Sequence, residues 1–115
     1  MKHPNLNAAI QAEIDLYLVA RRNRIQSKCS HHLGRAHILA QKRIIPHITV
    51  HLMMLFHALS RRDVKEIGGQ LVRLLATVPG HLFNKLPKGN TGWANVSMFR
   101  EMEIPSDLKK ILERN

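Results

Sequence analysis

The chain has 115 residues, a formal net charge of +10 and a single cysteine. Its length is enough for one domain with a modest core, and a hydrophobic fraction of 44% excludes a disordered chain. One cysteine excludes an intramolecular disulfide and a Cys-X-X-Cys zinc site. Residues 1–5 lack the apolar stretch of a secretory leader, and proline and histidines interrupt the apolar residues 44–59. We therefore expect a cytoplasmic protein that does not enter a membrane.

Apolar residues repeat at helical spacing in the first part of the chain and predict three helices before residue 62. The first helix begins after Asn5, a candidate N-cap, and ends in a basic turn at residues 21–27. The second helix spans about residues 28–41. Pro46 suits the first turn of a third helix. We expect the third helix to place one stripe in the core: Ile48, Leu52, Leu55 and Leu59.

A fourth helix follows Asp63, which together with Glu66 resembles a capping box. We expect this helix to stop at Pro79 and Gly80. Two glycines lie inside it, and each costs about 1 kcal/mol relative to alanine. We therefore expect another backbone to pack closely against this helix. Its predicted core stripe consists of Val64, Ile67, Leu71, Leu74 and Val78.

Residues 80–105 lose the helical period and contain many turn-forming residues. Because apolar side chains are interspersed among them, we expect a packed strap rather than a disordered segment. Ser106 is a candidate cap for a short helix over about residues 106–114. The predicted fold is all-α: a four- to five-helix, mostly antiparallel bundle over about residues 5–79, an irregular C-terminal strap and a short terminal helix. All belong to one domain, residues 1–115.

Three histidines form the strongest chemical pattern. His47 and His51 are one turn apart on one helical face, a spacing at which two imidazoles can chelate one metal. In an antiparallel hairpin His37 lies across from both. Three imidazoles on facing helices suit zinc, copper or nickel, with water, Gln41 or Met54 as a fourth ligand. The chain lacks the HExxH pattern of metalloproteases, so we interpret the cluster as a non-catalytic metal or metal-cofactor site.

An enzyme with a pocket lined by histidine and asparagine is an alternative. Its catalytic chemistry would need a carboxylate from another helix, for which Glu13, Asp15 and Glu66 are candidates. The candidate pocket residues near the histidine cluster are His32, Gln41, Met54, Asn90, Thr91 and Asn95.

The charge distribution supports a second alternative, a basic module that binds nucleic acid or an acidic protein. No acidic residue lies between Asp15 and Asp63, and such a field attracts anions. Aromatic residues make up only 4% of the chain, so the stacking platforms of single-strand binders are missing. Short loops place two of the helix connections at one end of the fold. The basic residues that would gather there are Arg21, Arg22, Arg24, Lys28, Arg61 and Arg62.

Four segments carry a resemblance to a known family. They read HLGRAHILAQ (32–41), HITVH (47–51), RRDVKEIGGQLVRL (61–74) and PKGNTGWANVSMFREMEIPSDL (87–108). Over roughly residues 8–112 the chain resembles the bacterial domain of unknown function 3703. The resemblance implies a small bacterial cytoplasmic protein, and it supplies no activity, substrate or catalytic residue.

Overall fold

The computed structural model describes residues 5–115, and within this range it contains five helices and no strand. The predicted all-α class is therefore confirmed. None of these helices combines the length and the apolar character needed to cross a membrane. The helices are α1 (Leu6–Arg22), α2 (Gln26–Ala40), α3 (Ile44–Ser60), α4 (Val64–Leu82) and α5 (Ser106–Glu113).

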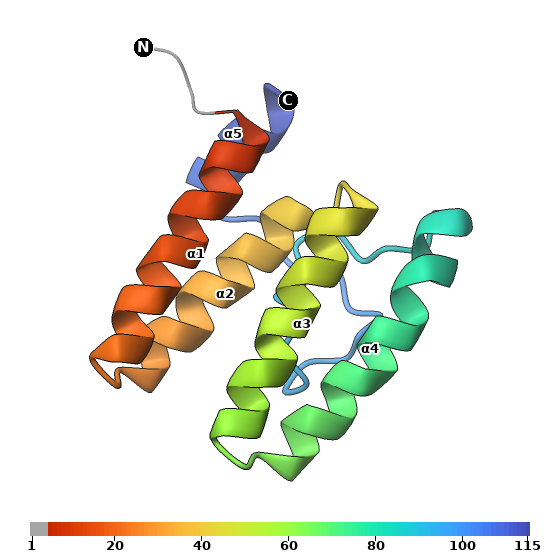
Figure 1. Ribbon diagram of the computed structural model, residues 1–115. Coiled ribbons are helices and arrows are strands. Elements are labelled where there is room, and N and C mark those ends of the chain that lie inside the picture. The colour runs from red at the N-terminus through yellow and green to blue at the C-terminus, as the bar shows by residue number, and fades with distance from the viewer. Residues whose placement is uncertain (1–4) are drawn as a thin grey trace.

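Helices α1 to α4 lie side by side in a row, and each runs antiparallel to the one before it (Figure 1). Each helix of the row packs on its neighbour, whereas α1 and α4 make no contact within residues 5–115. Helix α5 packs on α1 and α2, and residues 83–105 form a strap that crosses behind the row in Figure 1. The strap thus covers one face of an open layer, in place of the closing contact of a four-helix bundle.

Two of the three predicted N-caps, Asn5 and Asp63, are present. The Asn5 side chain accepts a hydrogen bond from the Ala8 N–H at 2.7 Å, and Asp63 accepts one from the Glu66 N–H at 3.1 Å. The reciprocal half of the capping box is not made, because the Glu66 carboxylate accepts from the Ala94 N–H of the strap instead. This bond ties the first turn of α4 to the strap.

Two predicted helix boundaries are wrong. Helix α4 continues through Pro79 to Leu82, because a proline removes one N–H but leaves the following turn able to form. That turn closes with bonds from the Phe83 N–H to the Pro79 carbonyl and from the Lys85 N–H to the Gly80 carbonyl, both at 2.9 Å. Ser106 does not cap α5. It is the first residue of the helix, and its N-cap Pro105 has no side chain that accepts a hydrogen bond.

The apolar core lies between α1, α2 and α5, with a contribution from α3. Its largest fully buried side chains include Leu6, Tyr17, Leu33, Leu39 and Leu108. This core fixes α2, the helix that supplies one of the candidate metal ligands, independently of α4.

The predicted core stripes of α3 and α4 are wrong. Leu52 and Leu59 of α3 are exposed, as are Val64, Leu71 and Val78 of α4, and the remaining stripe positions Ile48, Leu55, Ile67 and Leu74 are only half-buried. Polar side chains take both buried positions of α4, Gln70 and Thr77, and half of those of α3, His47, His51 and His57. The other buried residues of α3 are Val50, Met54 and Ala58. Helix α4 turns its polar side toward the strap and its apolar stripe outward, so the hairpin is inverted relative to an ordinary amphipathic pair.

The close approach expected at the paired glycines is confirmed at Gly69. A Cβ there would lie 2.4 Å from the Cβ of Ala94 in the strap, whereas Gly68 faces open space. The strap itself is packed, as expected. Trp93 is buried and its indole N–H donates to the Ser30 carbonyl of α2 at 2.9 Å. The strap therefore contacts both α2 and α4, on either side of α3.

Candidate metal centre

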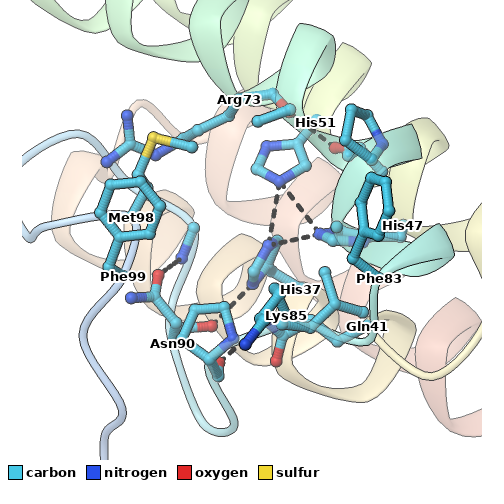
Figure 2. A pocket seen from close by; sticks show the side chains of 17 residues that line it. His37, Gln41, His47, His51, Arg73, Phe83, Lys85, Asn90, Met98 and Phe99 are labelled. Carbon is cyan, nitrogen blue, oxygen red and sulfur yellow. Dashed lines mark hydrogen bonds between the residues drawn. The ribbon is translucent and has the colours of Figure 1, made fainter.

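Three buried histidines meet between α2 and α3, as the spacing predicts. Helix α2 supplies His37, and α3 supplies His47 and His51 from successive turns (Figure 2). The Nε2 atom of His37 lies 3.0 Å from each of the other two Nε2 atoms, which lie 3.2 Å from one another. The three Nε2 atoms thus form a nearly equilateral triangle.

The outer nitrogens of two rings establish which atoms carry hydrogen. His37 Nδ1 lies 2.7 Å from the Asn90 carbonyl, which only accepts, so Nδ1–H is the donor. His51 Nδ1 lies 2.7 Å from Oε1 of Gln70. The Gln70 amide nitrogen donates to the Glu66 carboxylate and to the Gly92 carbonyl, which fixes the amide orientation. The neutral rings of His37 and His51 therefore direct lone pairs, not hydrogens, into the triangle.

The third ring has a histidine as its outer partner. His47 Nδ1 lies 3.0 Å from Nε2 of His81, near the end of α4. When the His47 Nδ1–H donates to His81, its Nε2 atom also presents a lone pair to the centre. In this tautomer three acceptor nitrogens converge with no hydrogen between them.

Burial keeps these imidazoles neutral. It is the main cause that lowers the pKa of all three rings, and the pKa of His47 falls to about 3. The neighbouring rings lower the pKa of His37 further, and the Arg73 charge lowers the pKa of both His37 and His51. At neutral pH the rings are therefore in the form that binds a metal.

The triangle has the dimensions of a metal site. With metal–nitrogen bonds of about 2.0–2.1 Å, neighbouring ligand nitrogens are separated by roughly 3.3 Å in a tetrahedral site and roughly 3.0 Å in an octahedral one. The observed 3.0–3.2 Å fits between the two. In both geometries three ligands leave the remaining coordination positions on one side of the triangle.

A cavity of about 360 Å³ borders the triad, and all three histidines line it. Of the predicted pocket residues, Gln41 and Asn90 also line this cavity (Figure 2). The other four lie elsewhere. His32 pairs with Glu13 of α1, Met54 is in the apolar core, Thr91 packs beside Gly34, and Asn95 is exposed.

Sequence reasoning missed the supporting residues Gln70, His81 and Gly92. Gly92 has φ +86°, and a Cβ there would lie 2.5 Å from the His37 ring. Its absent side chain lets the strap lie directly on that ring. The signal for Gln70 was an uncharged polar residue directly after the paired glycines of α4, where a close approach was already expected. Glu66, a predicted candidate carboxylate, contacts the site through the Gln70 amide rather than directly.

The predicted basic residues are all exposed, and the α1–α2 and α3–α4 turns that carry them lie at the same end of the row (Figure 1). They are remote from the cavity, since none of them lines it. Binding of nucleic acid or an acidic protein at this end stays a prediction.

The fold and the site define an all-α protein with a buried three-histidine cluster beside a cavity. The chain belongs to the family described as protein of unknown function DUF3703, whose sequence profile matches residues 4–112. The resemblance found in the sequence is thereby confirmed over nearly the whole chain. No curated protein and no solved structure matches the chain significantly.

Proposed function

We propose that this protein binds one divalent transition-metal ion, zinc, copper or nickel, through His37, His47 and His51. The main support for this proposal is the triangle of Nε2 atoms, which lie 3.0–3.2 Å apart. Two acceptor nitrogens at that separation repel one another, because each directs a lone pair at the other. A shared cation turns this repulsion into attraction.

The hydrogen bonds around the triad support the proposal. Metal-bound histidines commonly donate their outer N–H to a carbonyl, amide or carboxylate, which orients the ring and raises its basicity. His37 and His51 make such bonds to Asn90 and Gln70. The supports come from the strap and α4, so two further segments hold the ligand rings in place.

The donor set favours ions of intermediate softness. Three neutral imidazoles suit zinc, copper and nickel. Met54, a candidate fourth ligand in the sequence analysis, packs in the core and does not line the cavity. A protein with this site would buffer, sense or deliver the ion. No carboxylate lines the cavity beside the triad, which favours binding over catalysis.

Calorimetry on chelator-stripped protein tests the proposal. We expect one zinc, copper(II) or nickel ion per chain at micromolar concentration or below. Replacing any of the three histidines by alanine should weaken binding by roughly 100- to 1,000-fold, the share of one ligand in a typical zinc site.

The matched control is His57→Gln, which alters a buried histidine of α3 outside the triad. Circular dichroism verifies that each variant is folded. The proposal is wrong if the stripped wild-type protein binds none of these ions stoichiometrically, or if His57→Gln weakens binding as much as His51→Ala does.

A further inference from the structure

The cavity beside the triad carries positive charge and no negative charge on its walls. Arg73 and Lys85 line it, and no aspartate or glutamate of the described part of the chain does. Figure 2 shows Lys85 beside Gln41 and Asn90, close to His37. Within residues 5–115 neither cation forms a salt bridge, and the Glu66 carboxylate acts on Arg73 only from beyond salt-bridge distance.

Arg73 is held rigidly at the wall. Its guanidinium donates to the carbonyls of Gly69, Trp93 and Val96, and its Nε atom is buried without a hydrogen-bond partner. The carbonyls fix the position of the guanidinium but do not neutralise it. A divalent ion held by three neutral imidazoles would add two further positive charges. The loaded cavity therefore favours an anion at the open coordination position.

The remaining lining residues are mainly apolar and favour a ligand with an apolar organic group. They include Ala76, Phe83, Leu86, Met98 and Phe99. Phe83 and Phe99 lie on opposite sides of the triad in Figure 2, and both are largely exposed at the rim. A volume of about 360 Å³ is at the lower end of the range for small-molecule pockets. An inorganic anion would leave most of this apolar wall without contact.

We infer that the cavity binds a small organic carboxylate, with its headgroup on the metal and beside Lys85 and its apolar body between Phe83 and Phe99. This inference rests on the proposed function, because the metal supplies the principal contact of the headgroup. It assigns the open coordination position to an organic ligand rather than to water alone.

The test uses the full-length protein loaded with cobalt(II), whose visible spectrum reports changes in coordination. Benzoate is the probe, formate carries the headgroup alone, and benzyl alcohol carries the ring without the charge. We expect benzoate to perturb the cobalt spectrum saturably. It should bind roughly 10- to 100-fold more tightly than formate, because its ring contacts the apolar walls. Benzyl alcohol should leave the spectrum unchanged.

A matched pair of lysine variants locates the headgroup. Lys85→Met should weaken benzoate binding about 10-fold, the loss of one charge-assisted contact, while cobalt affinity stays unchanged. Lys88→Met alters an exposed lysine that does not line the cavity, and it should bind benzoate like the wild type.

The outcomes separate the two proposals. If the protein binds none of zinc, copper(II), nickel and cobalt(II), both are overturned. If it takes up metal but benzoate does not perturb the spectrum, or formate binds equally well, the metal site stands and the carboxylate site is overturned. Equal benzoate affinity in the two lysine variants also overturns the assignment of the headgroup to Lys85.

Discussion

Helix α3 buries histidines at two places, and their surroundings differ. At His57 both ring nitrogens have a polar partner: the Tyr17 hydroxyl lies 3.1 Å from Nδ1, and Oε1 of Gln26 lies 2.8 Å from Nε2. A single neutral tautomer satisfies this arrangement, with Nε2–H as donor and the tyrosine O–H donating to Nδ1. At His51 only the outer nitrogen is satisfied in this way, because its inner nitrogen lies 3.0 Å from Nε2 of His37, which is also an acceptor.

The difference separates a structural histidine from a candidate ligand. Burial alone does not do so, because both regions are buried and burial lowers the pKa of His57 as well. The number of hydrogen-bond partners of each ring nitrogen separates the two kinds of histidine. A buried polar group normally has a partner, so convergent acceptor nitrogens distinguish candidate metal ligands from a structural histidine.

The largest expected effect comes from a variant that displaces one ring of the triad without replacing a ligand residue. Gly92→Ala places a Cβ against the His37 ring and a side chain at φ +86°. Because His37 must move, zinc affinity should fall by roughly 100- to 1,000-fold, as if one ligand were lost. Calorimetry measures this. Gly68→Ala, whose added methyl meets open space, is the control and should retain full affinity while gaining about 1 kcal/mol of stability. Wild-type zinc affinity in Gly92→Ala would contradict the geometry.

The next largest effect is a loss of stability when the polar surroundings of His57 are disrupted. His57→Leu leaves the Tyr17 hydroxyl and the Gln26 amide without their partner, so the free energy of unfolding should fall by about 2–3 kcal/mol. Urea denaturation measures the loss. Zinc affinity should stay within about twofold of the wild type, given the typical independence of sites that share no partner. A large loss of zinc affinity would mean that the two regions are coupled.

A pair of glutamine variants sharpens the comparison. Gln70→Met removes the acceptor that orients His51, and Gln26→Met removes the corresponding acceptor from His57. We expect the first to weaken zinc binding by roughly 10- to 100-fold and the second to leave it unchanged. Competition with a chromophoric chelator measures both affinities. Equal affinities in the two variants would refute a supporting role for Gln70.

The smallest effect concerns acid stability of the metal-free protein. The pKa of His47 in the fold is about 3, so between its ordinary value near 6.5 and that value the unfolded chain binds a proton that the folded chain does not. Stability from the neutral ring is complete above about pH 6.5 and declines as the pH falls. From pH 6.5 to 5.5 the unfolded imidazole goes from half to almost fully protonated, so the wild type should lose about 1 kcal/mol more than His47→Leu. Urea unfolding at both pH values measures it, and parallel pH profiles would contradict the assignment.

The ligands could be predicted from the sequence because their relation is local. His47 and His51 are one helical turn apart, and a short turn brings His37 across from them. Their supports could not be predicted in the same way. Gln70 lies 19 residues beyond His51 and was not among the predicted site residues. Asn90 lies 53 residues beyond His37 and was predicted only as a pocket residue, not as the partner of that ring. Their positions depend on how α4 and an irregular strap pack, which helical periodicity does not encode.

The predicted core stripes of α3 and α4 were wrong for a different reason. Periodicity groups residues onto one face correctly, but it does not show which face turns inward. Leu52 and Leu59 share a face, as do His47 and His51, and the structure buries the face that carries these two histidines. Polar contacts to Gln70 and the strap offset the apolar burial that the other orientation would supply.

The strap lies against the ligand rings through its backbone, so its amide groups can report on the state of the site. The Gly92 amide donates to the Asn90 side chain, while the Ala94 amide donates to Glu66, the residue that also holds Gln70. An ion that immobilises His37 and His51 would suppress local opening of those two amides. Their deuterium uptake, followed residue by residue, would then report occupancy from a part of the chain that contributes no ligand.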